Sequence, residues 1–190
     1  VEINAIKKIL GLQQDKIYND LSELRYGKIM VLTDADVDGS HIKGLIFNFI
    51  HYFWPSLMKI SSVNFINSMI TPIVKLTKGK DIKEFYTLNE MNEWKQNNQL
   101  TGWNVKYYKG LGTSTATEAK DYFKKMNVNT IGYNWDSDSD ESIQLAFRKD
   151  LADERKRWIL DGVKSGEVAD RNKTLPYSDF IHKDLIWFSI

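Results

Sequence analysis

The sequence predicts an α/β fold in which a mainly parallel sheet is flanked by helices. Residues 28–33, KIMVLT, form a short apolar run of strand-forming residues that follows Gly27. Three aspartates come next, and they are followed by an amphipathic helical pattern. Because open α/β sheets bind ligands at the carboxyl ends of their strands, this acidic turn is expected at a functional edge. The helical pattern has apolar residues at Ile42, Leu45, Ile46, Phe49, Ile50 and Phe53.

The other elements follow from similar local patterns. Residues 2–12 have the composition of a short amphipathic helix that stops at Gly11, and Pro55 should end the long helix because proline lacks a backbone donor. Thr115 and Glu118 have the spacing of a helix-capping box. Strands are also predicted at 69–76, 84–87, 103–108 and 130–135, and helices at 88–97 and 151–163.

The bulk composition sets wide limits on function. The chain has 190 residues, of which 42% are hydrophobic, so it can form one domain or two small ones. The net charge of +1 neither requires nor excludes a nucleic-acid partner. The absence of cysteine excludes disulfides and thiolate chemistry and suits an intracellular protein. Neither a signal peptide nor a membrane-spanning run is recognisable, and the Val at position 1 suggests a piece of a longer protein.

The acidic turn contains Asp34, Asp36 and Asp38 within five residues. Such carboxylates repel one another unless they are well solvated or face cations. Mg²⁺ fits, because it is held by one or two carboxylates and keeps waters for a phosphate substrate. A solvated turn is one alternative. A calcium-binding loop is another, because D-x-D-x-D-G matches the first half of an EF-hand, although Leu45 stands where its bidentate Glu belongs.

Taken in order, these segments resemble the TOPRIM region, a Rossmann-like fold, of the type IIA DNA topoisomerases of eukaryotes and large DNA viruses. The resemblance covers most of the chain and includes the segment that leads into a winged-helix domain. It implies a TOPRIM core at 1–76 that lacks its N-terminal Glu-bearing strand, and an adjacent α/β region with a helical connector at 77–190. The matching stretches are LRYGKIMVLTDADVDGSHIKGLIFNFIHYFWPSLM (24–58), ITPIVKL (70–76), WNVKYYKGLGTSTATEAKDYF (103–123), IQLAFRK and DERKRWI (within 143–159) and YSDFIHKDLIWFS (177–189).

The resemblance implies a fragment of an ATP-dependent topoisomerase that passes one DNA duplex through a transient break in another. A tyrosine outside this chain would cleave the DNA. Asp34 and Asp36 align with the acids of the two Mg²⁺ positions, the first shared with a Glu upstream of residue 1, and Asp38 would act through water. ATP would be used by another domain, so this fragment alone is expected to be inactive. The whole enzyme is expected to be a homodimer on double-stranded DNA, with no membrane contact, in the nucleus or at the host-cell site of viral DNA replication.

Two further segments carry candidate site residues. His41 could contact the DNA backbone, orient an acid, or simply cap the helix. The loop KGLGT places Lys109 beside two glycines, which allow a close backbone approach, ahead of a capped helix that favours phosphate; a plain turn is the alternative. The predicted catalytic residues are Asp34, Asp36, Asp38, His41 and Lys109, and the predicted DNA contacts are Lys28, Lys43, Lys106, Lys109, Gly110, Gly112 and Thr113.

A second enzyme class shares the acidic motif. Primase-like and nuclease-like TOPRIM proteins also carry out phosphoryl transfer with such aspartates. They are expected to lack KGLGT and the helical segments after it, both of which this sequence contains. Topoisomerase is therefore the leading hypothesis, with the TOPRIM primase or nuclease class and the calcium-binding protein as alternatives.

Overall fold

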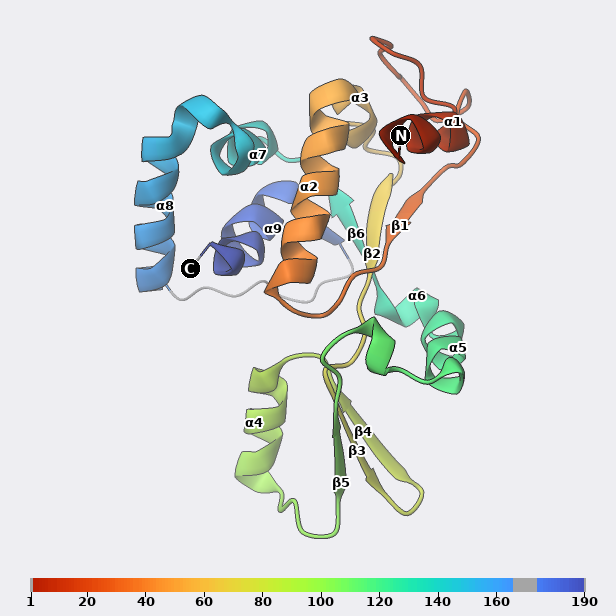
Figure 1. The fold of residues 1–190 in the computed structure, drawn as a ribbon, viewed down its shortest axis with the longest axis vertical. Helices are drawn as coiled ribbons and strands as arrows, with labels where there is room; N and C mark the ends of the chain where they lie inside the picture. The colour runs from red at the N-terminus through yellow and green to blue at the C-terminus, as the bar shows by residue number, and fades with distance from the viewer. Residues whose placement is uncertain (1, 166–173, 190) are drawn as a thin grey trace.

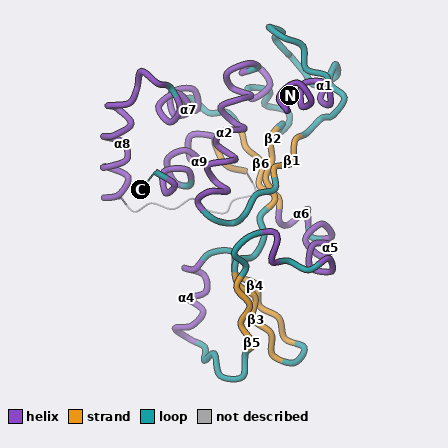
Figure 2. Tube along the Cα trace, in the orientation of Figure 1, coloured by secondary structure: helices purple, strands orange, loops and turns teal. Residues whose placement is uncertain are grey.

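The computed structural model describes residues 2–165 and 174–189, which form two lobes (Figure 1). The upper lobe holds a sheet covered by helices. The lower lobe holds a second sheet with one helix against it. Figure 2 shows that the chain crosses between the lobes after β2 and returns before β6.

The first sheet has the strand order β1-β2-β6-β7. β1 pairs with β2 in parallel, with Ile29 opposite Ile66; β2 and β6 are antiparallel, and β6 and β7 are parallel. This arrangement, together with the surrounding helices, confirms the predicted α/β fold with a mainly parallel sheet. The strands are β1 (Ile29–Val31), β2 (Ile66–Met69), β6 (Thr130–Asn134) and β7 (Thr174–Pro176).

The helices of this lobe cover the sheet and supply most of its core. Phe47 of α2 is fully buried, and its ring lies 4.7 Å from the rings of both Tyr133 and Phe180. This packing fixes α2 against the sheet and so fixes its first turn at the sheet edge. The helices are α1 (Glu2–Leu10), α2 (Val37–Phe53), α3 (Pro55–Met58), α7 (Ser139–Phe147), α8 (Ala152–Ser165) and α9 (Tyr177–Lys183), with short 3₁₀ turns η2 (Lys149–Leu151) and η3 (Leu185–Phe188).

The second sheet is antiparallel and has the order β4-β3-β5. Helix α4 packs on it through Met91, and Trp94 and Trp103 meet edge to face beside this small core. The connection back to the first sheet passes through a 3₁₀ turn and two helices. These elements are β3 (Val74–Lys78), β4 (Asp81–Phe85), α4 (Leu88–Asn97), β5 (Asn104–Tyr107), η1 (Leu111–Thr113), α5 (Ala116–Lys124) and α6 (Met126–Asn129).

One predicted strand was wrong. Residues 69–76 were expected to form a single strand, but β2 ends at Met69 in the first sheet and β3 begins at Val74 in the second. Pro72 lies between them, and proline removes a ladder donor and restricts the residue before it. The domain boundary predicted between residues 76 and 77 stays a prediction. The first sheet contains β1 and β2 from before this boundary and β6 and β7 from after it.

None of the helices in the described ranges, 2–165 and 174–189, is both long and apolar enough to cross a bilayer.

Candidate metal site at the carboxyl end of β1

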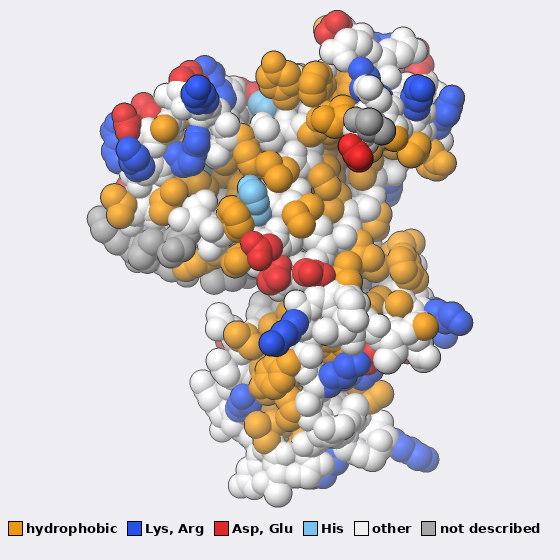
Figure 3. Space-filling view, in the orientation of Figure 1, with side chains coloured by type: hydrophobic (Ala, Val, Ile, Leu, Met, Phe, Trp, Pro, Cys, Tyr) orange, Lys and Arg blue, Asp and Glu red, His pale blue; other side chains and the backbone are white. Residues whose placement is uncertain are grey.

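Asp34 and Asp36 lie between the end of β1 and the start of α2, as the sequence predicted, whereas Asp38 lies inside α2. Asp36 is the N-cap of α2, and its Oδ1 accepts a hydrogen bond of 2.8 Å from the Gly39 amide. Asp38 lies in the first turn, where a negative charge interacts favourably with the helix dipole. All three aspartates are exposed. Figure 3 shows acidic side chains gathered where the two lobes meet, with Lys and Arg side chains just below them.

The turn is tight because of Gly39. A Cβ at this position would lie 1.9 Å from the carbonyl oxygen of Asp34, a contact that only glycine avoids. The helix therefore begins directly beneath the backbone of Asp34. Asp34 and Asp36 consequently project from one short, well-defined segment.

The loop KGLGT reaches Asp34 from the other lobe. The Leu111 amide donates a hydrogen bond of 2.7 Å to Asp34 Oδ1. A Cβ on Gly110 would lie 2.7 to 3.0 Å from the carboxylate atoms of Asp34. Two segments far apart in the sequence thus meet at one carboxylate, and Gly110 is the residue that permits the approach.

The two N-terminal acids of the turn fit a magnesium ion. Asp34 and Asp36 each use Oδ1 in one hydrogen bond, and within residues 2–165 and 174–189 neither Oδ2 has a hydrogen-bonding partner. Those residues contain no cluster of three or more acidic, histidine or cysteine side chains that could hold a metal alone. Two carboxylates with free oxygens suit Mg²⁺, which keeps several waters.

The calcium-loop alternative was wrong. An EF-hand loop needs twelve residues between two helices, but here a strand precedes Asp34 and α2 begins at Val37. Leu45, the twelfth position, lies inside α2. The loop that an EF-hand would require is therefore replaced by helix.

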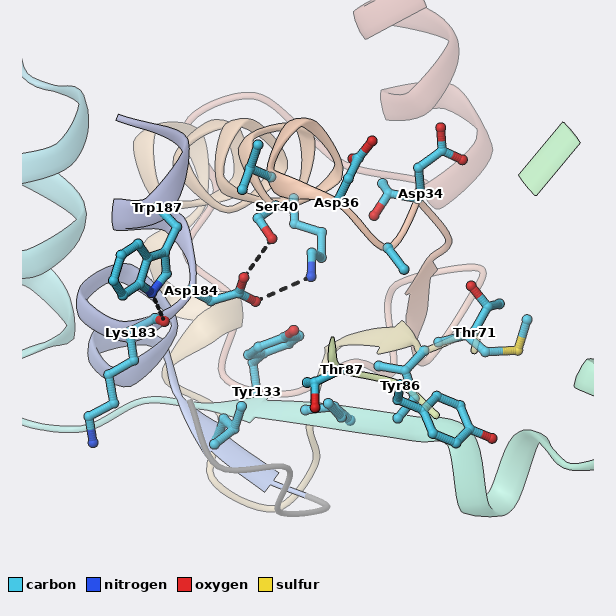
Figure 4. Close-up of a pocket in the computed structure, with 18 residues that line it drawn as sticks. Asp34, Asp36, Ser40, Thr71, Tyr86, Thr87, Tyr133, Lys183, Asp184 and Trp187 are labelled. Carbon is cyan, nitrogen blue, oxygen red and sulfur yellow. Dashed lines mark hydrogen bonds and ion pairs between the residues drawn. The ribbon is translucent and has the colours of Figure 1, made fainter. Parts of the chain in front are cut away.

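A cavity of about 300 Å³ opens beside the acidic turn (Figure 4). Asp34 and Asp36 lie on its α2 side, and Tyr86 and Thr87 lie on the opposite side. Its wall toward the C-terminal segment contains Asp184. The cavity and the acids therefore form one concave region at the carboxyl ends of β1 and β2.

Comparison with known proteins identifies the family. The sequence profile of the family described as the C-terminal associated domain of TOPRIM matches residues 69–190. DNA topoisomerase 2 of Arabidopsis thaliana is 48% identical over 100% of this chain, and DNA topoisomerase 2-alpha of Gallus gallus is 46% identical over 99% of it. A solved structure, the DNA-binding, cleavage and re-ligation domain of Plasmodium falciparum topoisomerase II, superposes with a TM-score of 0.92 at 46% identity, covering 99% of this chain and 26% of that one.

The chain belongs to the type IIA DNA topoisomerase 2 family. It spans 13% of the length of both the Arabidopsis and the Gallus relative. The resemblance read from the sequence is thereby confirmed for the family and for the fold.

The topoisomerase fragment holds two of its predicted DNA-contacting lysines in ion pairs. Lys43 Nζ lies 3.4 Å from Asp184 Oδ2 and 5.4 Å from the Phe180 ring centroid. Lys106 Nζ lies 2.8 Å from Glu118 Oε2. Both cations already have an anionic partner, so any phosphate contact would have to compete with it.

The other predicted contacts lie in different places. Lys109 and Gly112 are exposed, and Lys109 forms no ion pair with any described residue. Thr113 Oγ1 donates a hydrogen bond of 2.7 Å to the Gly110 carbonyl and so stabilises the loop. Lys28 precedes β1 and is therefore at the opposite end of that strand from the acids.

His41 has a packing partner that the sequence did not reveal. Its ring stacks on Phe188 of η3, with centroids 3.9 Å apart and an interplanar angle of 9°. The contact joins the first turns of α2 to the C-terminal segment. The predicted catalytic role of His41 stays a prediction.

Asp184 is a residue of this site that sequence reasoning missed. Its Oδ1 accepts a hydrogen bond of 2.6 Å from Ser40 Oγ, while its Oδ2 pairs with Lys43. It therefore binds α2 one turn after the capping residue Asp36. No local pattern marks Asp184, because its partners lie more than 140 positions earlier in the chain.

Proposed function

We propose that this chain is the part of an ATP-dependent type IIA topoisomerase that holds Mg²⁺ during DNA cleavage and religation. Asp34 and Asp36 would bind the ion through their free oxygens. The observation that carries the proposal is the pair of neighbouring exposed carboxylates, each with an oxygen unused among the described residues, on a chain 46% identical to a DNA-cleavage domain. The similarity includes KGLGT and the helices after it, which favours a topoisomerase over a primase-like or nuclease-like protein.

Each residue has a defined part in this proposal. Asp34, fixed by Leu111, and Asp36, fixed by Gly39, present preorganised oxygens. Asp38 adds negative charge beside them and would act through water. Mg²⁺ bound there would supply positive charge that stabilises the oxygens of the phosphodiester as it breaks and reforms. The nucleophilic tyrosine, the ATPase domain and a Glu that completes the two-ion site would belong to other parts of the enzyme.

The partners follow from the same proposal. The substrate would be double-stranded DNA, steered by exposed cations such as Lys109. The whole enzyme would act as a homodimer inside the cell. A relative from Dictyostelium discoideum that is 43% identical carries the name DNA topoisomerase 2, mitochondrial, so the compartment would be one that contains DNA, the nucleus or an organelle.

The test is a substitution in the full-length enzyme. Asp34→Ala and Asp36→Ala should each lower the rate of supercoil relaxation by about 10²-fold or more, the scale of losing one preorganised electrostatic group. DNA affinity measured without Mg²⁺ should be retained. Glu93→Gln, an exposed acid on α4, is the matched control and should relax DNA normally. Undiminished relaxation by Asp34→Ala would remove the proposal.

A further inference from the structure

The amide of Leu111 is available to Asp34 because of its place in the loop. Leu111 is the first residue of η1, and the turn is closed by amides further on, from Thr113 to the Gly110 carbonyl and from Ser114 to the Leu111 carbonyl. The first amides of a helical turn have no partner within it. The Leu111 amide instead donates a hydrogen bond of 2.7 Å to Asp34 Oδ1. A hydrogen bond to an ionised carboxylate is about twice as strong as a neutral one.

The loop itself is fastened at both ends by Glu118. Its carboxylate accepts hydrogen bonds from Lys106 and Tyr108, on β5 and directly after it, at 2.8 and 2.5 Å. It also accepts one of 2.8 Å from the Thr115 amide, where α5 begins. Gly110 and Leu111 lie between these two anchored positions. The Leu111 amide is therefore held in place where it donates to Asp34.

We infer that the Leu111 amide, admitted by Gly110, is the positioning group of Asp34: it fixes one carboxylate oxygen and leaves the other available to the metal ion. The inference rests on the proposed function and deepens it. It gives Gly110 a role different from the phosphate approach that the sequence suggested. The glycine is required because any side chain there would meet the Asp34 carboxylate at 2.7 to 3.0 Å.

A metal ligand loses affinity when its orienting partner is removed. Such partners are typically worth about 10- to 100-fold in metal affinity. Leu111→Pro removes the N–H of residue 111 and leaves every other amide of the loop in place. Gly110 is extended, with φ of 172° and ψ of 176°, which suits the residue before a proline, and the first helical position tolerates proline well.

The decisive comparison is Leu111→Pro against Leu111→Ala in the full-length enzyme. Both shorten the side chain, but only the alanine variant keeps the N–H. Leu111→Pro should raise the Mg²⁺ concentration for half-maximal DNA cleavage by about 10- to 100-fold. It should weaken Mn²⁺ binding, measured by electron paramagnetic resonance, by a similar factor. Leu111→Ala should leave both values unchanged, and metal-free DNA affinity should be the same for the two variants.

Two glycine variants give an independent check. Gly110→Ala should shift the metal dependence as Leu111→Pro does. Gly27→Ala, before β1 and outside the predicted site, should not, because a Cβ at Gly27 meets no atom within 4 Å. Thermal unfolding of each variant separates a local effect from a loss of fold.

The outcomes distinguish this inference from the proposal on which it rests. Relaxation that survives Asp34→Ala overturns the proposed function and the inference with it. If Asp34→Ala abolishes cleavage while Leu111→Pro and Leu111→Ala share one metal dependence, only the inference is overturned. Weaker metal-free DNA binding by Leu111→Pro with unchanged Mn²⁺ affinity also overturns it, because the loop would then act on DNA rather than on Asp34.

Discussion

Glu118 joins strand β5 to helix α5 through Lys106, whose Nζ lies 2.8 Å from Glu118 Oε2. The same carboxylate completes the capping box of Thr115. Desolvation raises the pKa of Glu118, but the hydrogen bonds from Lys106, Thr115 and Tyr108 outweigh it and lower the pKa to about 2. The carboxylate that fastens the KGLGT loop is therefore ionised throughout the neutral range.

The first prediction concerns this fastening. Glu118→Ala removes the glutamate half of the capping box, while Thr115 remains the N-cap, and it also removes the charged hydrogen-bond partner of Lys106. It should therefore lower the free energy of unfolding by roughly 1–2 kcal/mol. Glu118→Gln should cost less, because glutamine also serves at this capping position. Denaturant unfolding at neutral pH measures both. Equal costs for the two variants would show that the charge, and not the cap, dominates.

A second prediction uses the pH dependence of the same residue. A carboxyl whose pKa is lowered on folding stabilises the protein above its unfolded pKa, ordinarily about 4.5, and that stability is lost as the pH falls toward about 2. The stability difference between the wild type and Glu118→Gln should therefore narrow from pH 5 to pH 2. A difference that stays constant over this range would contradict the lowered pKa.

His182 gives a third prediction. Its Nδ1 accepts a hydrogen bond of 2.8 Å from Trp158 Nε1 of α8, so its Nε2 carries the proton toward Ser142 Oγ of α7, 2.9 Å away. Partial burial lowers the pKa of His182 below 6.5, although Asp179 and other acids raise it. Protonation of Nδ1 would occupy the lone pair that accepts the hydrogen bond from Trp158, so this bond would be lost.

The free energy of unfolding should accordingly fall as the pH drops below about 6.5, and the loss should end once the pH passes the folded pKa. His182→Asn, which keeps an acceptor but does not titrate, should remove this part of the pH dependence. Imidazole proton signals followed by NMR against pH give the pKa directly. A His182 pKa at or above 6.5 would refute the account.

Local sequence patterns correctly predicted the elements whose structure depends on a single segment of the chain. The helix expected at 88–97 is α4, from Leu88 to Asn97, because Thr87 and Glu90 form a capping box. The strand expected at 69–76 failed because its apolar residues serve two different sheets, and the division at Pro72 depends on which partners lie beside each half.

In the candidate site, likewise, the positions of the acids were predictable from local sequence and their long-range contacts were not. A strand, an acidic turn and a helix in succession were enough to place Asp34 and Asp36 at a sheet edge, and the structure confirms that position. The contacts that hold them were not predictable. Leu111 reaches Asp34, and Asp184 reaches Ser40, across long stretches of chain, and neither contact leaves a periodic signal in the sequence.

Asp184 gives a fourth prediction. Asp184→Ala would leave the hydroxyl of Ser40, a buried residue, without its acceptor, so it should lower the free energy of unfolding by about 1–3 kcal/mol. Asp184→Asn keeps an oxygen for Ser40 and should cost less. A double-mutant cycle with Ser40→Ala measures the coupling between the two residues. Additive effects would mean that the 2.6 Å hydrogen bond contributes nothing to stability.

The last prediction separates the lysines that were expected to contact DNA. Lys109 is exposed and has no ion-pair partner among the described residues, whereas the Lys43 side chain is 14% exposed and paired with Asp184. Each phosphate contact contributes about 0.9 to the slope of log affinity against log salt. Lys109→Gln in the full-length enzyme should therefore flatten that slope by about 1, while Lys43→Gln should leave it nearly unchanged.

Lys8→Gln is the matched control for this titration and should leave the slope unchanged, because Lys8 is exposed on α1 and is not among the predicted DNA contacts. Filter binding or fluorescence anisotropy over a series of salt concentrations gives the slopes. An unchanged slope for Lys109→Gln would remove it from the DNA contacts. A slope flattened by Lys43→Gln would instead show that DNA displaces Asp184 from Lys43, because a lysine cannot neutralise a phosphate fully while it keeps its carboxylate partner.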